Sequence, residues 1–156
     1  MSDRAPARES ASPRGPGSPP ELHHVAVVVR DIDAALSFYR DRLGLSPREV
    51  RDLPSERVRI AFLPLANCQL ELVQPLDAES GVARYLAARG EATLHHVCLA
   101  VDGLAETLDR LARAGVKLID AVPRRGAEGD VAFLHPRAAN GVLVELLDRA
   151  SARRAR

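Results

Sequence analysis

A repeat in the sequence constrains this chain more than any other feature. Leu22-His23-His24-Val25 opens an apolar run, and the same pattern returns at Leu94-His95-His96-Val97. Each run is followed by an amphipathic stretch that ends at a glycine, Gly44 or Gly115, as many helices do. A strand and helix that recur in this way predict one duplicated module rather than two unrelated domains.

The correspondence continues beyond the predicted helices. Each half next contains two apolar runs separated by a turn signal, which predicts a hairpin. The runs are 58–63 and 69–73 in the first half, and 131–134 and 142–147 in the second. The sequence therefore predicts an α+β fold of two tandem βαβββ modules with mixed or antiparallel sheets.

We expect one domain over residues 21–149, with repeat halves of about 21–76 and 93–148 joined by a helix of about 79–90. Residues 1–20 hold five of the 11 prolines and little to bury, which predicts a disordered tail. A mitochondrial presequence is the alternative, although the acidic residues and prolines disfavour its amphipathic helix. Residues 150–156 are rich in arginine, and we expect a flexible C-terminus there.

Composition excludes several classes of function. The chain has 22 basic and 21 acidic side chains, so it lacks the basic excess of a nucleic-acid binder. Its longest uncharged apolar run, Val25 to Val29, is far too short for a membrane span. Cys68 and Cys98 lie in apolar runs without CxxC spacing, which favours a reducing compartment. We therefore expect a cytoplasmic protein.

Strand alternation predicts which histidine of each pair faces a cavity. His24 shares a face with small Ala26, and His96 shares one with Cys98. The other face carries the large β-branched residues, so it is expected to pack under the helices together with His23 and His95. The small-residue face leaves space into which His24 and His96 can point.

One carboxylate, Glu71 or Glu145, stands in the middle of the last apolar run of each half. A carboxylate there is costly unless it is paired or bound to a cation. Two histidines and two glutamates at matching repeat positions suit a divalent transition-metal ion, and would leave two positions for a bidentate ligand. The alternative is four unrelated residues that make ordinary hydrogen bonds or face water at an edge.

These residues and the stretches around them resemble the vicinal-oxygen-chelate, or glyoxalase/bleomycin resistance-like, superfamily, and within it the methylmalonyl-CoA epimerase family. The likeness covers residues 21–148, and its most specific stretches are 61–75, 94–97, 133–136 and 140–146. The family's metal ligands fall on His24, Glu71, His96 and Glu145, in agreement with the alternation argument. The first carboxylate position is glutamine in some members.

The resemblance implies a homodimeric isomerase that interconverts the 2R and 2S epimers of methylmalonyl-CoA by proton abstraction at C2, through an enolate. It also implies an acyl-CoA substrate and a divalent ion such as cobalt, manganese, nickel or zinc. Glu145, besides being a ligand, is similar to a residue proposed as an acid/base in the family.

Two departures from the family pattern bear on the chemistry. Ile60 occupies the position of a second glutamate found in some members, which leaves the second acid/base unassigned, with Glu56 the nearby carboxylate to test. The family's Gly-Ala-His-Gly loop has Glu128 in place of histidine, within residues 126–129, and is one residue shorter before Val131.

Other side chains and other functions stay open at this point. Arg124 and Arg125 could meet CoA phosphates or lie in a solvated loop, and His135 could line a pocket or simply end a strand. A glyoxalase I-type lactoylglutathione lyase would use the same four ligands. An extradiol dioxygenase would need only two histidines and one carboxylate. A metal-free small-molecule binding protein would be expected to lack the set.

Overall fold

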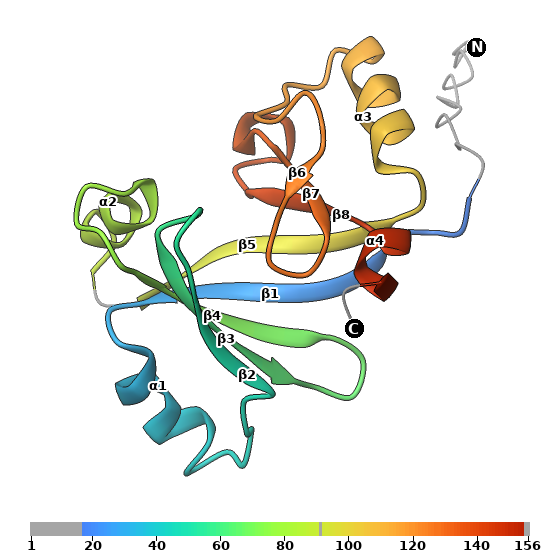
Figure 1. Cartoon of the computed structure of the whole chain (residues 1–156). Coiled ribbons are helices and arrows are strands. Elements are labelled where there is room, and N and C mark those ends of the chain that lie inside the picture. The colour runs from blue at the N-terminus through green and yellow to red at the C-terminus, as the bar shows by residue number, and fades with distance from the viewer. Residues whose placement is uncertain (1–16, 91, 155–156) are drawn as a thin grey trace, which may run out of the picture.

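Eight strands form one curved, mixed sheet in the computed structural model, which describes residues 17–90 and 92–154 (Figure 1). The order across the sheet is β2-β3-β4-β1-β5-β8-β7-β6. The first half of the chain comprises β1 (Glu21–Val29), α1 (Ile32–Tyr39), β2 (Glu49–Leu53), β3 (Val58–Pro64) and β4 (Gln69–Pro75). A helix, α2 (Gly81–Ala87), lies within the segment predicted to link the halves.

The second half repeats the same order of elements. It comprises β5 (Ala92–Val101), α3 (Leu104–Arg113), β6 (Arg124–Arg125), β7 (Asp130–Leu134) and β8 (Val144–Asp148), followed by α4 (Arg149–Arg154). A single 3₁₀ turn, η1 (Pro136–Ala138), lies between β7 and β8. The predicted α+β fold of two tandem βαβββ modules is therefore confirmed.

The two halves join through their first strands at the centre of the sheet. β1 pairs antiparallel with β5, and each of them pairs in parallel with the last strand of its own half, β4 or β8. Equivalent residues of the two halves consequently meet around the β1–β5 pair. This arrangement is what brings the repeated histidines and glutamates to one place.

Local sequence explains where the helices begin. Asp31 caps α1 by accepting a hydrogen bond from the Ala34 amide at 2.9 Å, and Ser80 caps α2 by accepting one from the Ala83 amide at 3.1 Å. α3 follows Gly103, whose φ of 63° lies in the left-handed region that glycine adopts readily. The buried face of α3 includes Leu104 and Leu108, at the helical spacing.

Apolar side chains are packed on both faces of the curved sheet. The outer clusters include Ile32 and Leu36 of α1 in the first half, and Leu104 and Leu108 of α3 in the second. On the inner face, a cluster around Phe62 joins residues of the first-half strands to α2. The inner face also holds the polar centre described below.

The C-terminus differs from the prediction. Residues 150–156 were expected to be flexible, whereas α4 packs against the body of the protein with Ser151 and Ala152 buried. Arg149 begins this helix, pairs with Asp102 at 2.6 Å and donates a hydrogen bond to the Ala100 carbonyl at 3.2 Å. A run of arginines indicates solvation, and the sequence alone does not reveal such a buried partner set. Residues 1–16 of the predicted tail and residues 155–156 of the predicted flexible end lie outside the described residues.

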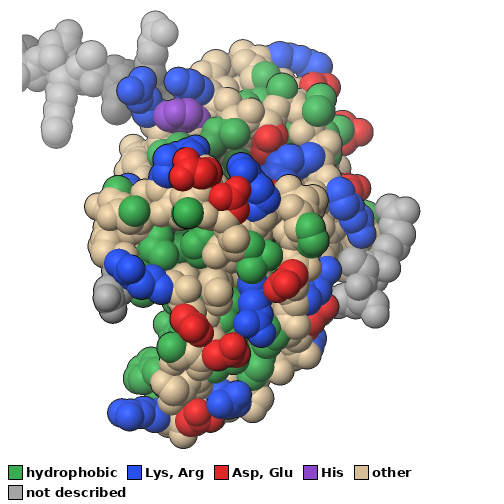
Figure 2. Space-filling model, turned by 60° about the vertical axis from the view of Figure 1, so that its left-hand side comes forward, with side chains coloured by type: hydrophobic (Ala, Val, Ile, Leu, Met, Phe, Trp, Pro, Cys, Tyr) green, Lys and Arg blue, Asp and Glu red, His purple; other side chains and the backbone are tan. Residues whose placement is uncertain are grey.

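Surface features agree with the composition. On the face shown in Figure 2, acidic and basic side chains are interspersed with apolar ones, as the near-neutral charge of the chain suggests. Within the described part of the chain, the helices are too short or too polar to cross a bilayer.

Candidate metal centre and its cavity

The four residues predicted as ligands come from the four central strands. His24 lies on β1, Glu71 on β4, His96 on β5 and Glu145 on β8. Strand register sets them side by side, because Ala26 pairs with Glu71 on one side of β1 and with His96 on the other. All four are buried, with exposed fractions of 5–8%.

The polar atoms of these four side chains converge. The Nε2 atoms of His24 and His96 are 3.0 Å apart, and Glu145 Oε2 lies 3.1 Å from each of them. Glu71 Oε2 lies 3.4 Å from His24 Nε2 and 3.7 Å from His96 Nε2. The structure thus brings together all four residues that the sequence predicted.

This donor set fits a divalent transition-metal ion. Two atoms bound to one ion at about 2.1 Å lie roughly 3.0–3.4 Å apart in octahedral or tetrahedral geometry, which is close to most of the separations found here. Imidazole nitrogen and carboxylate oxygen are also the ligand types that such ions accept. A cation would compensate two carboxylates that are otherwise costly to bury.

The protonation of the site reflects this burial. Burial alone would lower the pKa of His24, but its hydrogen bond to Glu145 and the charges of Glu71 and Glu145 raise it above the ordinary value. Burial raises the pKa of Glu71. Burial also opposes ionisation of Glu145, yet its hydrogen bonds with His24 and His96 hold its pKa well below the usual range.

The outer histidines correct the alternation argument. The pairing of β1 with β5 skips His23 on one strand and His95 on the other, so each is the extra residue of a β-bulge. His23 places its Nδ1 at 2.9 Å from Nδ1 of His24, and His95 does the same to His96 while its ring also packs edge-on against Tyr85 of α2. A bulge breaks the two-residue period, which the sequence pattern does not reveal.

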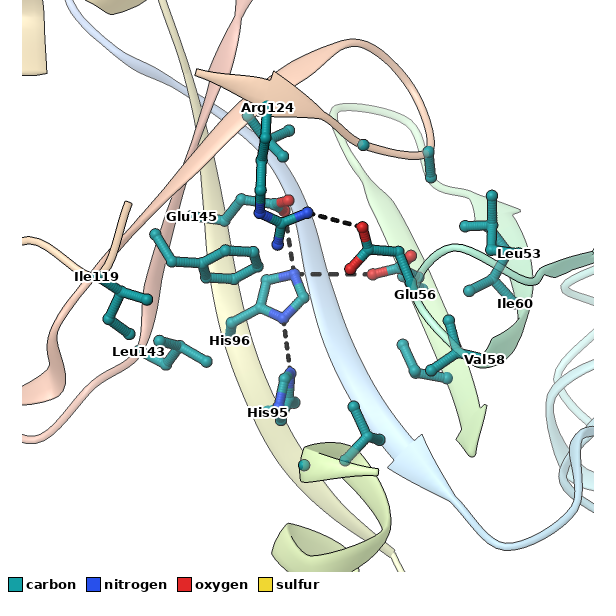
Figure 3. Close-up of a pocket in the computed structure, with 18 of the residues that line it drawn as sticks. Leu53, Glu56, Val58, Ile60, His95, His96, Ile119, Arg124, Leu143 and Glu145 are labelled. Carbon is teal, nitrogen blue, oxygen red and sulfur yellow. Dashed lines mark hydrogen bonds and ion pairs between the residues drawn. The ribbon is translucent and has the colours of Figure 1, made fainter. Parts of the chain in front are cut away.

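A cavity of about 310 Å³ opens beside the centre. Glu71, His96 and Glu145 line it, together with apolar residues such as Ile60 and Phe133 (Figure 3). Its lining resembles that of small-molecule sites, being mostly apolar with a few converging polar groups.

A charged pair from opposite halves lies at this cavity. Arg124 of β6 donates a hydrogen bond to Glu56 of the β2–β3 turn at 2.8 Å, and its guanidinium stands 5.3 Å from the centre of the Phe133 ring (Figure 3). Arg124 therefore faces the cavity, whereas Arg125 pairs with Asp130 and is largely exposed. His135 caps the 3₁₀ turn by accepting a hydrogen bond from the Arg137 amide at 3.1 Å, and it is not among the residues that line the cavity.

The loop between β6 and β7 contributes Glu128, a residue to which the sequence assigned no role of its own. Glu128 reaches from the second half to the first, where it accepts hydrogen bonds from Arg48 and from Gln69 Nε2, the latter at 2.7 Å. Its Oε2 lies 3.5 Å from His23 Nε2. Glu128 replaces the histidine of the family's loop, and this departure was the one signal in the sequence that pointed to it.

Comparisons with known proteins agree with this geometry. The model of the Glyoxalase/Bleomycin resistance protein/Dioxygenase superfamily matches residues 23–133. A mitochondrial methylmalonyl-CoA epimerase of Mus musculus is 40% identical over 126 residues, which is 80% of this chain and 71% of the relative. An ethylmalonyl-CoA/methylmalonyl-CoA epimerase of Cereibacter sphaeroides is 39% identical over 127 residues, or 80% of this chain and 95% of the relative.

A solved structure gives the same result at the level of the fold. Methylmalonyl-CoA epimerase in complex with methylmalonyl-CoA and NH4+ superposes with a TM-score of 0.78 and 28% identity. The match covers 86% of this chain and 98% of that one.

Proposed function

The chain belongs to the Glyoxalase/Bleomycin resistance protein/Dioxygenase superfamily, and we propose that within it the protein is an isomerase that interconverts the 2R and 2S epimers of methylmalonyl-CoA. One observation carries the proposal. A buried centre of two histidines and two glutamates opens onto a cavity of about 310 Å³, in a chain that is 39–40% identical to two methylmalonyl-CoA epimerases over 80% of its length.

His24, Glu71, His96 and Glu145 would hold a divalent ion, with cobalt, manganese, nickel and zinc as the candidates. When bound, such an ion stabilises negative charge that develops on substrate oxygens. The buried position of the four residues excludes most water from the reacting groups and strengthens their electrostatic effect. The apolar lining next to them accommodates the acyl group.

Glu145 is our candidate for one acid/base. Its carboxylate lines the cavity and is ionised at neutral pH, so that it can accept a proton from C2 of a bound acyl group. The thiol of Cys98, on the neighbouring strand, has its pKa raised by burial and by the charge of Glu145. Cys98 therefore stays protonated, so that its thiol can donate a hydrogen bond to the Glu145 carboxylate and does not compete with it as a base.

Epimerisation requires a second group on the opposite face of C2. Ile60 also lines the cavity but has no ionisable group and cannot serve, whereas Glu56 lines the same cavity from another loop. Glu56 is our candidate for the second acid/base. The E56Q variant should still exchange the C2 proton of one epimer with solvent, but it should form the other epimer at least tenfold more slowly than the wild type. Epimerisation by E56Q at the wild-type rate would remove Glu56 from the reaction.

Incubation of metal-reconstituted protein with one epimer of methylmalonyl-CoA in D₂O tests the activity directly. We expect deuterium at C2 and formation of the other epimer, because the abstracted proton is replaced from solvent. Turnover of methylglyoxal with glutathione, without either result, would favour the lactoylglutathione lyase. Failure of both reactions, with no metal retained, would favour a binding protein.

Metal content tests the ligand assignment. We expect E71A and E145A each to lose most of the bound ion, because each removes one donor from a set of four. E49Q, at a carboxylate on β2 that pairs with Arg51, should keep the wild-type content. Full retention of metal in both alanine variants would refute the site.

The homodimer and the cytoplasmic location are also part of the proposal. Leu22 and Leu94 of the central strands are 40% and 66% exposed, next to half-buried Val25 and Val97, which gives an apolar stripe for a second copy to cover. L94K should shift the mass measured by light scattering from dimer to monomer.

Two free cysteines, Cys68 and Cys98, support a reducing compartment.

A further inference from the structure

We propose that Glu128 is a positioning residue for the metal centre: it acts through His23 to hold the ring of His24 with Nε2 toward the other ligands. The inference rests on the metal centre of the proposed function and not on the substrate. It concerns the one ligand, His24, that does not line the cavity among the described residues.

Glu128 is fixed in place by groups of the first half. Its side chain is only 10% exposed, and each of its carboxylate oxygens has a partner: Arg48 at Oε1 and Gln69 at Oε2. These bonds keep the pKa of Glu128 below its ordinary value despite burial. An Arg51 guanidinium also donates a hydrogen bond to the neighbouring Ala127 carbonyl at 2.6 Å, which holds the loop against the first half.

The ring nitrogens define a chain of proton positions. If Nε2 of His24 keeps its lone pair for the centre, the ring proton of neutral His24 is on Nδ1. That N–H points to Nδ1 of His23 at 2.9 Å, which must then accept. The proton of His23 is consequently on Nε2, the atom that lies 3.5 Å from Glu128 Oε2.

The separation of 3.5 Å is long for a hydrogen bond, so Glu128 acts on His23 mainly through its charge. A carboxylate beside an N–H favours the tautomer that carries the proton there. The negative charge of Glu128 next to His23 also raises the basicity of the His24 ring that is hydrogen-bonded to His23, as carboxylates behind metal-bound histidines generally do. Glu128 therefore selects the arrangement in which His24 presents a lone pair.

The second half provides an internal contrast. His95 contacts His96 through the same pair of Nδ1 atoms, at the same 2.9 Å. Behind His95, however, the structure places the ring of Tyr85, with centroids 4.8 Å apart and planes at 89°. The two histidine ligands thus share one bulge geometry but differ in what supports them: a carboxylate behind His24 and a neutral aromatic ring behind His96.

Metal affinity of the full-length protein tests the proposal. E128Q keeps the size of the side chain and removes its charge, and we expect the dissociation constant for Co²⁺, measured by competition with a chelator, to rise about 10- to 100-fold. D130N removes a neighbouring carboxylate that pairs with Arg125 at the surface and should change it less than about twofold. Equal affinities of E128Q and D130N would overturn the proposal.

A double-mutant cycle tests whether Glu128 acts through His23. H23Q alone should weaken Co²⁺ binding, and adding E128Q to it should weaken binding no further. Additive losses would show that Glu128 acts by another route and would also overturn the proposal. If the wild-type protein does not bind Co²⁺ at all, the metal centre itself is refuted. This result is therefore distinct from a failure of the role proposed for Glu128.

Nitrogen-15 NMR of the wild-type protein loaded with diamagnetic Zn²⁺ gives a reading that needs no variant. The proposal expects the ring proton of His23 on Nε2. A proton on Nδ1 of His23 would break the chain to Glu128 and overturn the proposal, even if E128Q failed to fold.

Discussion

Addition of a divalent ion to the metal-free protein should release protons. His24 has a pKa above its ordinary 6.5, and Glu71 has one above its ordinary 4.5. At about pH 6 the His24 ring is therefore mostly charged, and part of Glu71 is neutral. A metal ion requires a neutral imidazole and an ionised carboxylate, so it must displace both protons.

The size of the effect follows from proton linkage. Each ligand proton that must leave makes the apparent affinity about tenfold weaker for each pH unit below the pKa of that ligand, or about 1.4 kcal/mol per unit. His24 should give most of one proton at about pH 6, and Glu71 should add to it. Affinity should hence rise at least about fivefold from pH 5.5 to 6.5, and level off once both groups are deprotonated.

Calorimetric titration with Mn²⁺ in two buffers of equal pH but different ionisation enthalpy counts these protons. E71Q provides a comparison in which proton release should fall, because glutamine has no proton to lose and because the pKa of His24 drops without the charge of Glu71. Stoichiometric binding at about pH 6 with no proton release would refute the reasoning, since the site would then already hold its ligands in the metal-binding forms.

Three further changes probe the scaffold and the centre. F62A removes a fully buried ring at the heart of the inner cluster, and urea unfolding should show a loss of about 3–5 kcal/mol. G129A should cost about 1–3 kcal/mol in the same assay, because φ is 157° and the new Cβ would lie 2.6 Å from a hydroxyl of α4, whereas G81A, with open space around it, should stay within about 0.5 kcal/mol. The pKa of Glu145 is lowered in the folded, metal-free protein, so its ionised form stabilises the fold at pH values above 4.5, the ordinary pKa of a glutamate. This contribution is lost as the pH falls below that value. The stability difference between wild type and E145Q should therefore shrink from about pH 6 to 3.5, and a constant difference would contradict the assigned shift.

The repeat made most of the fold predictable. Two strands with the same Leu-His-His-Val start, each followed by a helix and a hairpin, left few ways to bury four apolar faces other than a duplicated module. The clustering of the four candidate ligands was also predictable, because histidine and glutamate each stand at matching positions in the strands of the two halves. His24 and His96 needed only the two-residue period of the strand, and Glu71 and Glu145 needed only the cost of burying a carboxylate.

Features that depend on contacts between the halves were harder to predict. Alternation placed His23 and His95 under the helices, but a bulge at each brings them to the inner ligands. A bulge has no fixed residue signature in these strands, because it is set by how two strands pair rather than by either strand alone. Likewise, Arg149 of the expected flexible end finds Asp102, a partner far away in the sequence.

The four candidate ligands are related by the repeat, but His24 and His96 differ in their surroundings. Glu71, His96 and Glu145 line the cavity, so these three residues are placed to meet a substrate. His24 lies behind them, with its ring edge-on to the buried ring of Phe62 at 5.9 Å. A ligand in that position cannot be adjusted by substrate, and its orientation has to come from the protein. The carboxylate of Glu128 stands behind this ligand, whereas the ligand that faces the cavity is backed by a neutral ring. Repeat symmetry therefore brings the four candidate donors together, and under the proposed function the residues that break the symmetry separate an anchored side, at His24, from a side that faces the substrate.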